Sequence, residues 1–282
     1  QMSRMTIAEL QQRKRQGLKL AMLTAYDHPI AKLVDAAGVD LVLVGDSLGM
    51  VVLGYDTTAP VTMDEMIHHA KAARRGVVRA LLIGDMPLAA LQAPAAEAVA
   101  HAKRFVGEAL CDGVKVEWRP GIEETVRDIV RAGIPVMGHV GLTPQTAAGE
   151  GGFGMRGTTA ESAARILEQA RSLEDAGCWS LVLECVPDAL AEEITRRLAI
   201  PTIGIGSGPR CDGQVVVTYD LVGLFDRFTP KFIKRYADVS TTIREAAAAY
   251  VNDVRSGAFP GAAQTVTMAA EELAKFRQGL TN

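Results

Sequence analysis

Short apolar runs alternate with longer amphipathic stretches along most of the chain. Each run consists mainly of aliphatic and β-branched residues and gives way to a polar or glycine-containing segment. This pattern is typical of strands that are buried on both faces of a parallel sheet. The clearest runs are residues 20–25, 40–46, 80–87, 113–117, 134–141, 179–187 and 201–208. We interpret LVGLFDRFTP, residues 221–230, as a weaker eighth run.

The stretches between the runs are rich in Ala, Glu and Arg and have a helical period. They predict helices over residues 63–76, 94–110, 161–177 and 189–198. Thr62 and Thr159 are suitable N-cap residues, and Gly76 and Gly177 suit the C-terminal ends of two of these helices.

Repeated alternation of strand and helix predicts a parallel sheet with helices outside it. Repeated units in a chain of 282 residues fit a (β/α)8 barrel better than a doubly wound sheet. No linker rich in Gly, Ser or Pro divides the chain, so we predict one domain over residues 6–282, after a flexible stretch at residues 1–5. Extra helices are expected at residues 6–16 before the barrel, and at 240–256 and 267–278 after it.

Composition and charge narrow the class of protein. Apolar residues make up 48% of the chain, which is enough for a large core. The net charge of −3 gives no reason to expect nucleic acid or a membrane surface as a partner. No run reaches the roughly 18–20 apolar residues of a membrane-spanning helix. The four cysteines form no CxxC pair and no metal-type spacing with histidine, which favours reduced thiols in a cytoplasmic protein.

Several predicted strands end in an ionisable or polar residue. In (β/α)8 barrels the reacting groups lie at the C-terminal ends of the strands. We therefore expect the side chains at these ends to meet at one rim: Asp46, Ser47, Asp85, Lys115, Glu117, His139 and Glu184.

A cluster of buried carboxylates suggests a metal ion. Burying several carboxylates without compensation would cost several kcal/mol for each one. Asp46, Asp85 and Glu117 are oxygen donors with no accompanying cysteine, which points to a hard cation such as Mg²⁺. A structural reading stays open, because Asp is common in turns and Lys115 with Glu117 could form a simple ion pair on one strand face. His139 could likewise be a core histidine.

Other polar features near the strand ends suggest further roles. Glu184 closes the very apolar strand SLVLE, so it needs a partner or a raised pKa. The segment GIGSG, residues 204–208, could bind phosphate through backbone N–H groups. GEGGFGMRG, residues 149–157, is expected to be a mobile loop over the site.

Together, several segments resemble the ketopantoate hydroxymethyltransferase family, from about residue 5 to residue 261. They are TAYD (24–27), VGDSLGMVVLGYDTT (44–58), GHVGLTPQ (138–145), VLECVP (182–187), IPTIGIGSG (200–208), DGQVVV (212–217) and PKFIKRYAD (230–238). The resemblance implies a (β/α)8 TIM barrel of the phosphoenolpyruvate/pyruvate type, assembled as a homodecamer.

The resemblance also implies a reaction and a set of residues. The family transfers a hydroxymethyl group from 5,10-methylenetetrahydrofolate to 3-methyl-2-oxobutanoate, which gives 2-dehydropantoate for pantothenate biosynthesis. The motifs match metal ligands to Asp46, Asp85 and Glu117, and the catalytic base to Glu184. They match substrate contacts to Asp46, Ser47, Asp85 and Lys115, and we add His139 to the substrate-binding residues.

The chain departs from the family pattern beside Glu117. The family usually follows this acid with a pair of glycines, whereas this chain has Trp118 and Arg119. The loop after the fourth strand must therefore differ in shape. The segment after Asp85, MPLAALQ, also lacks the aromatic residue that the resemblance leads us to expect.

The residues themselves suggest the same chemistry. Mg²⁺ chelated by a 2-oxo acid would stabilise the enolate that forms when C3 loses a proton to Glu184. Lys115 could bind the substrate carboxylate and Ser47 could donate a hydrogen bond. Three alternatives stay open: a metal-dependent lyase or mutase that acts on a C–C bond of a 2-oxo acid, a Schiff-base aldolase that uses Lys115, and a non-catalytic scaffold.

Overall fold

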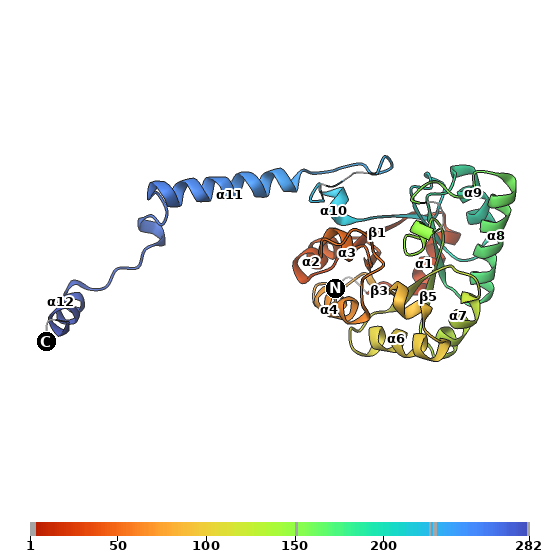
Figure 1. Cartoon of the computed structure of the whole chain (residues 1–282), viewed down its shortest axis with the longest axis horizontal. Helices are drawn as coiled ribbons and strands as arrows, with labels where there is room; N and C mark the ends of the chain where they lie inside the picture. The colour runs from red at the N-terminus through yellow and green to blue at the C-terminus, as the bar shows by residue number, and fades with distance from the viewer. Residues whose placement is uncertain (1–3, 150–151, 226, 228–229, 281–282) are drawn as a thin grey trace.

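The computed structural model describes residues 4–149, 152–225, 227 and 230–280. Parallel strands form a closed barrel in sequence order, with helices packed around it (Figure 1). This confirms the predicted (β/α)8 fold. The strands are β1 (Leu20–Thr24), β2 (Leu41–Val44), β3 (Leu81–Asp85), β4 (Gly113–Glu117), β5 (Val136–Gly141), β6 (Ser180–Glu184), β7 (Thr202–Ile205) and β8 (Gly213–Val216).

The predicted position of the eighth strand was wrong. β8 is the segment GQVV, and it closes the barrel by pairing Gly213 with Leu20 of β1 and with Ile203 of β7. Gly213 and the exposed Gln214 interrupt the apolar pattern and hide the strand. Glycine is needed there, because a Cβ at residue 213 would lie 2.6 Å from the carbonyl oxygen of Leu20.

The segment that we had expected to be the eighth strand begins in a short helix and continues as a loop. This helix, α10 (Thr218–Leu221), directly follows β8. The described residues after it, 222–225, 227 and 230, form no strand, while residues 226 and 228–229 lie outside the described part of the chain. The segment therefore follows the C-terminal end of the strand that closes the barrel.

The predicted outer helices are present, and two of them begin at the expected caps. Thr62 forms a capping box with Glu65, and Thr159 forms one with Ser162. Gly76 and Gly177 each follow the C-cap residue directly. The helices around the barrel are α2 (His28–Ala36), α4 (Met63–Arg74), α6 (Ala95–Gly107), α7 (Ile122–Arg131), α8 (Ala160–Asp175) and α9 (Asp188–Arg197), with the short α3 (Leu48–Val51), α5 (Leu88–Gln92) and η1 (Ala147–Gly149).

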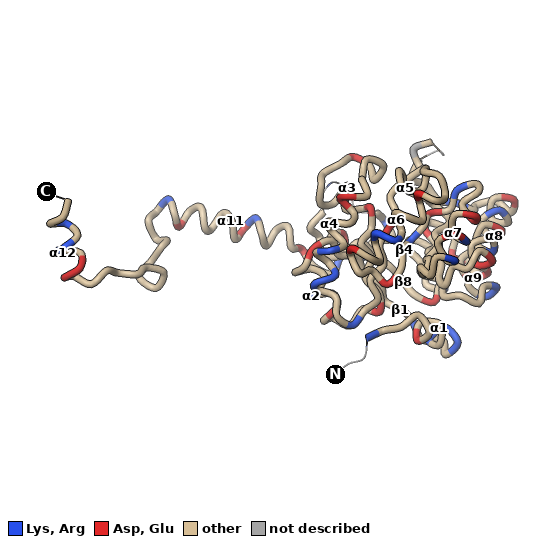
Figure 2. The backbone as a smooth tube through the Cα atoms, turned by 90° about the horizontal axis from the view of Figure 1, so that it is seen from below, with Lys and Arg blue, Asp and Glu red and all other residues tan. Residues whose placement is uncertain are grey.

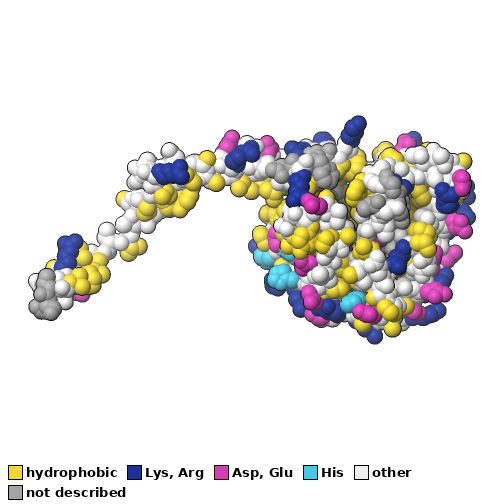
Figure 3. Space-filling model, in the orientation of Figure 1, with side chains coloured by type: hydrophobic (Ala, Val, Ile, Leu, Met, Phe, Trp, Pro, Cys, Tyr) yellow, Lys and Arg dark blue, Asp and Glu magenta, His cyan; other side chains and the backbone are white. Residues whose placement is uncertain are grey.

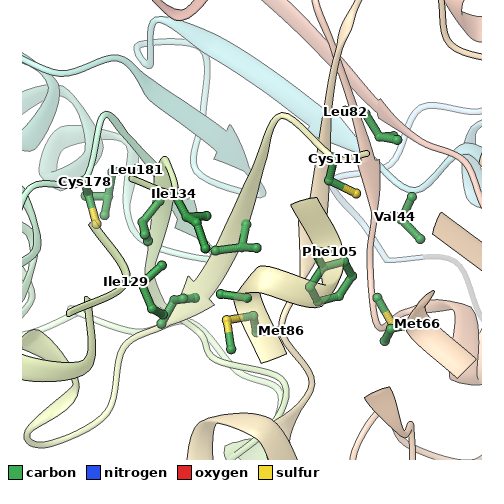
Figure 4. Packing of buried hydrophobic residues seen from close by; sticks show 14 of the residues in the cluster. Val44, Met66, Leu82, Met86, Phe105, Cys111, Ile129, Ile134, Cys178 and Leu181 are labelled. Atoms are coloured by element: carbon green, nitrogen blue, oxygen red, sulfur yellow. The ribbon is translucent and has the colours of Figure 1, made fainter. Parts of the chain in front are cut away.

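The main core lies between the strands and the outer helices. Figure 4 shows part of it, with Phe105 of α6 among buried residues that include Met66 and Met86. Fully burying a side chain of this kind stabilises the fold by roughly 1.5–3 kcal/mol. The core therefore holds the strands, and with them the strand ends, in fixed positions.

The N-terminal end of the barrel is closed by helix α1 (Ile7–Arg15). Its Leu10 is buried with Met22 of β1, and Met5 belongs to the same cluster. Arg4 forms an ion pair with Asp112 at 2.6 Å. The packed part of the chain thus begins before the predicted boundary at residue 6. Figure 2 shows α1 at the opposite end of the barrel from α3 and α5, which leaves the C-terminal ends of the strands free for a site.

The C-terminal segment extends away from the barrel as an arm. It contains α11 (Val239–Ser256), η2 (Ala262–Gln264) and α12 (Ala270–Gly279) (Figure 1). Neither long helix of the arm has a buried residue. Ile243, Tyr250 and Val254 of α11 are exposed, and Figure 3 shows apolar side chains gathered along the arm. No helix within the described residues has the length and apolar character needed to span a membrane.

We predict that Gly84→Ala destabilises the barrel by about 1–3 kcal/mol, the usual cost of overpacking a core. A Cβ at residue 84 would lie 2.3 Å from the ring of the buried Phe105. Gly107→Ala is the matched control, since it lies in helix α6 with no atom within 4 Å of the added Cβ. It should be neutral or stabilising by up to about 1 kcal/mol. Urea denaturation measures both changes, and equal stability of the two variants would contradict the packing argument.

Candidate active site

A cavity of about 560 Å³ opens at the C-terminal ends of the strands. Its size lies in the usual range of about 300–1,000 Å³ for small-molecule sites. Every candidate residue that the sequence suggested lines this cavity: Asp46, Ser47, Asp85, Lys115, Glu117, His139 and Glu184. The expected convergence of strand ends is therefore present, while the chemical role of each residue stays a prediction.

The pairing of neighbouring strands brings these side chains together. Asp85 on β3 is level with Lys115 on β4, and Glu117 on β4 is level with His139 on β5. Lys115 Nζ lies 2.8 Å from Oδ1 of Asp85 and 3.8 Å from Oε1 of Glu117. Burial acts to lower the pKa of Lys115, but the surrounding carboxylates outweigh burial and raise it. The Lys115 amine is therefore held as a cation.

The two aspartates at the base of the cavity are poorly compensated. Burial raises the pKa of Asp46 well above its usual value, and the charges of Asp85 and Glu117 add to the rise. Burial also raises the pKa of Asp85, although Lys115 opposes it. The backbone N–H of Asp46 donates to Oδ2 of Asp85 at 3.1 Å. Further positive charge beside these two carboxylates would stabilise the site.

Gln145 joins the acids from the loop after β5. Its side-chain amide donates to Oδ2 of Asp46 at 2.9 Å and to the carbonyl oxygen of Met86 at 3.0 Å. Its backbone N–H donates to Oε2 of Glu117 at 3.2 Å. Sequence reasoning did not single out Gln145, although it ends the segment GHVGLTPQ. A buried polar residue in a loop that follows a predicted strand was the available signal.

His139 lies between two carboxylates. Its Nδ1 is 3.5 Å from Oε1 of Glu117, and its Nε2 is 3.2 Å from Oε2 of Glu184. Burial and Lys115 act to lower the pKa of His139, but the two carboxylates outweigh them and raise it to about 9. The two carboxylates therefore favour the protonated form of His139, while Lys115 Nζ lies 3.3 Å from the same Nδ1. His139 is also the partner that the position of Glu184 required.

Glu117 differs from the two aspartates in its environment. Burial acts to raise its pKa, but His139, Lys115 and the N–H of Gln145 outweigh burial and lower it. Glu117 is thus held as an anion by protein groups, whereas at Asp46 and Asp85 burial outweighs the compensating contacts.

The carboxylate oxygens of the cavity are of the kind that binds a hard cation such as Mg²⁺. Within the described ranges, no three His, Cys, Asp or Glu side chains are arranged to enclose a metal ion. Mg²⁺, however, commonly uses only one or two protein carboxylates and completes its shell with water and substrate. Oδ1 of Asp85 has Lys115 Nζ 2.8 Å away, and burial still raises the pKa of Asp85 despite this cation. Asp46 and Asp85 therefore fit a cation, and ligation by all three acids stays a prediction.

Tyr26 is a second residue that sequence reasoning missed. It is fully buried, and its hydroxyl shares a hydrogen bond of 2.8 Å with Oγ of Ser47. The tyrosine ring also packs edge-on against Tyr219, with 5.5 Å between ring centroids. Ser47 is thus held in place by the TAYD segment that follows β1.

Trp118 and Arg119, the two departures from the family pattern, lie outside the lining of the cavity. Trp118 packs against the outer core, and its backbone N–H donates to the carbonyl oxygen of His139 at 2.8 Å. Arg119 donates to the carbonyl oxygen of Leu91 at 2.7 Å. Neither residue lines the described cavity.

The two glycine-rich segments, residues 149–157 and 204–208, contribute to the structure in different ways. Phe153 of the loop at residues 149–157 lines the cavity, although residues 150–151 lie outside the described part. In the segment 204–208, the hydroxyl of Ser207 donates to the carbonyl oxygen of Leu183 at 2.8 Å, which ties β7 to β6. Phosphate binding by this segment stays a prediction.

Comparison with known proteins identifies relatives over nearly the whole chain. The family model described as ketopantoate hydroxymethyltransferase matches residues 4–262. The chain is 52% identical to the 3-methyl-2-oxobutanoate hydroxymethyltransferase of Heliobacterium modesticaldum, over 92% of this chain and 94% of the relative. It is 50% identical to the enzyme of the same name from Carboxydothermus hydrogenoformans, over 96% and 99% of the two chains.

Solved structures share the fold at low sequence identity. A phosphoenolpyruvate phosphomutase from Streptomyces platensis subsp. rosaceus has a TM-score of 0.61 and 13% identity, over 98% of this chain and 96% of the other. A 2,3-dimethylmalate lyase of the PEP mutase/isocitrate lyase superfamily has a TM-score of 0.59 and 15% identity, over 97% and 98%. These likenesses show that the chain shares its barrel fold with those two proteins.

We predict that Gln145→Ala lowers turnover by about 10- to 100-fold. A lost hydrogen bond to a charged group costs roughly 1.5–3 kcal/mol, and here it would leave Asp46 without its donor. Gln214→Ala is the control, because its amide donates at 2.9 Å to the carbonyl of Gly208 at an exposed position. It should retain activity within about twofold. The turnover number of each variant is measured by steady-state kinetics. Equal losses of turnover in the two variants would show that Gln145 has no specific role in the site.

Proposed function

Because the chain belongs to the ketopantoate hydroxymethyltransferase family and is a transferase, we propose that it transfers a hydroxymethyl group to 3-methyl-2-oxobutanoate. The donor in this proposal is 5,10-methylenetetrahydrofolate, and the product is 2-dehydropantoate, a step of pantothenate biosynthesis. One observation supports this proposal most strongly. The same cavity contains a lysine, Lys115, that lies between two carboxylates, and a glutamate, Glu184, that lies beside His139.

The cavity offers an anchor for the anionic substrate. Lys115 is a buried cation that lines the cavity, so it can attract the carboxylate of a 2-oxo acid. Ser47 can add a hydrogen bond, because its hydroxyl has a partner in Tyr26 and can still reach the cavity. A permanently charged Lys115 also disfavours the Schiff-base alternative, which needs a neutral amine.

Asp46 and Asp85 would hold Mg²⁺ in this proposal, with Glu117 as the third acid beside them. When bound, the cation supplies a Lewis acid for the oxygens of the 2-oxo acid. The poorly compensated charges of the two aspartates support this assignment. Gln145 keeps Asp46 oriented through the side-chain hydrogen bond.

Glu184 is the proposed base for the C3 proton. Its side chain is 15% exposed, more than the other acids of the cluster, and it therefore reaches the cavity. His139 Nε2 lies 3.2 Å from one oxygen of Glu184 and the pKa of His139 is raised, so His139 is better suited to orient the base than to take the C3 proton itself. The carbon nucleophile formed in this way bonds to the methylene carbon of the donor, the two bonds from that carbon to the folate nitrogens break, and water supplies the hydroxyl group. Tetrahydrofolate leaves with one proton from C3 and one from the water.

We also propose that the chain forms a homo-oligomer, a decamer by its resemblance to the family, in which the arm packs on a neighbouring subunit. Ile243, Tyr250 and Val254 expose apolar surface on α11 without a covering element among the described residues. Exposed apolar surface of this kind commonly marks a protein interface.

Asp46→Ala and Asp85→Ala should each reduce Mg²⁺-dependent turnover by about 10³-fold, because Lewis-acid stabilisation is worth several kcal/mol. Asp128→Ala, on the exposed face of α7, should keep full activity and serves as the control. Bound metal is first removed from the wild type and from each variant with a chelator. Turnover is then measured over a range of Mg²⁺ concentrations. Wild-type activity in either cavity variant without Mg²⁺ would remove the metal site from the proposal.

Glu184→Gln should slow proton removal from the substrate by roughly 10²–10⁴-fold, the usual worth of a general base. The assay follows hydrogen–deuterium exchange at C3 of 3-methyl-2-oxobutanoate by NMR, with Mg²⁺ and without any folate. Omitting the donor isolates proton removal from C–C bond formation. Glu192→Gln, at an exposed position of α9, is the matched control and should exchange at the wild-type rate. Unchanged exchange in Glu184→Gln would assign the base to another residue.

A further inference from the structure

The cavity has a second wall that the charged cluster does not use. This wall is formed after β8, by α10 and the described residues that follow it. The residues of this part that line the cavity are Val217, Asp220, Phe225, Pro230, Phe232 and Ile233. Apart from Asp220, all of them are apolar, so a single carboxylate faces the cavity from an apolar surface.

Asp220 is a largely buried carboxylate that lines the cavity. Its residue is only 9% exposed, and its backbone N–H already donates to the carbonyl oxygen of Val217 at 3.0 Å. Among the described residues, the charge of Arg235 is the one stabilising influence on its carboxylate that accompanies the effect of burial. Burial raises the pKa of Asp220 to about 6, even though the charge of Arg235 acts to lower it. The carboxylate is thus ionised at neutral pH, and a ligand with N–H or O–H donors would compensate its burial.

The 2-oxo acid cannot supply these donors. It is an anion at neutral pH and carries only acceptor oxygens, so Asp220 would repel it. A carboxylate presents two parallel acceptor oxygens, which match a ligand that has two adjacent N–H groups on one rigid edge. The partner of Asp220 must therefore be a different molecule from the acceptor substrate.

The same wall suits a flat ring. Phe225 is buried, while Phe232 is 44% exposed and lies against the end of β7. A Cβ at Gly206 would be 2.8 Å from the ring of Phe232, so glycine at this position leaves space for the phenylalanine. Phe153 lines the cavity from the loop after β5. Flat heteroaromatic ligands stack well on such side chains.

Asp220 is also close to the residues that would hold the acceptor. Asp220 directly follows Tyr219, whose ring packs edge-on against Tyr26 with 5.5 Å between the ring centroids. The hydroxyl of Tyr26 bonds to Ser47 at 2.8 Å. A ring bound at Asp220 would therefore lie beside the acceptor substrate.

We propose that Asp220 and Phe232 bind the pterin ring of the folate donor, with the Asp220 carboxylate accepting hydrogen bonds from the 2-amino group and the adjacent ring N–H. Phe232 provides a face for stacking. This inference rests on the proposed function, because it takes the one-carbon donor to be a folate. It assigns the donor to the wall after β8 and the acceptor to the charged cluster.

The first test measures binding of tetrahydrofolate by calorimetry. Asp220→Asn should weaken binding by about 10- to 100-fold, the effect expected when an ionised hydrogen-bond acceptor is lost. Asp56→Asn is the matched control. Its side chain lies at the mouth of the same cavity but is fully exposed and paired with Arg227 at 3.3 Å. This control should bind within about twofold of the wild type, and equal weakening in both variants would indicate a general charge effect and overturn the inference.

A change in the ligand tests the same contact without relying on a variant. The 2-desamino-2-methyl analogue of tetrahydrofolate lacks the amino group that the proposal places against Asp220. Wild-type enzyme should bind this analogue about tenfold more weakly than tetrahydrofolate, whereas Asp220→Asn should bind the two ligands equally, because the two changes remove one interaction. Equal affinity of the wild type for both ligands overturns the inference, even if Asp220→Asn does not fold.

Failure of this inference can be told apart from failure of the proposed function. Wild-type enzyme that produces no 2-dehydropantoate from 5,10-methylenetetrahydrofolate would refute the folate donor, and the inference with it. Wild-type enzyme that uses the folate, while Asp220→Asn binds tetrahydrofolate as tightly as the wild type does, would refute only the role of Asp220.

Discussion

The candidate site depends on the charge of one buried lysine. Lys115 lies on β4 among Asp85, Glu117 and Asp46, and each of these carboxylates helps to keep the amine protonated. Without this cation, the barrel would bury a group of like charges at considerable cost. Since Lys115 and His139 offset only part of the negative charge, the remaining imbalance falls on Asp46 and Asp85. That imbalance is the physical reason to expect a divalent cation, and it shapes the chemistry proposed for the cavity.

The cavity has two parts that differ in polarity, one with a cluster of charged side chains and one that is mainly apolar. One part is formed by strand ends, whose positions are fixed by backbone pairing between β3, β4, β5 and β6. The other part is formed by α10 and the loop after it, which contribute apolar side chains and Asp220. A reaction between two substrates of different size and polarity needs such a division, because one surface cannot suit both a small anion and a large flat ring.

The sequence predicted the barrel well because both faces of most of its strands are buried. That constraint gives β1 to β7 their apolar runs, and it allowed their positions to be read directly. β8 obeys the same constraint less clearly. Gly213 is required by the close approach of Leu20, and Gln214 is exposed, so the local pattern is no longer that of a strand. Only closure of the sheet, which needs a strand between β7 and β1, identifies GQVV as the eighth strand.

The sequence by itself determined which strand ends carry ionisable groups, since a polar residue that closes an apolar run is visible in one dimension. From this and the barrel geometry, the meeting of Asp46, Asp85, Lys115, Glu117, His139 and Glu184 followed. Only the tertiary structure decided which of these groups are charged and what each one touches. The pKa of His139 is raised by carboxylates on β4 and β6, and Gln145 reaches Asp46 from far along the chain. The pKa of Asp220 is raised because the fold buries it. Burial and electrostatic fields arise from neighbours in space, which the order of residues along the chain does not specify.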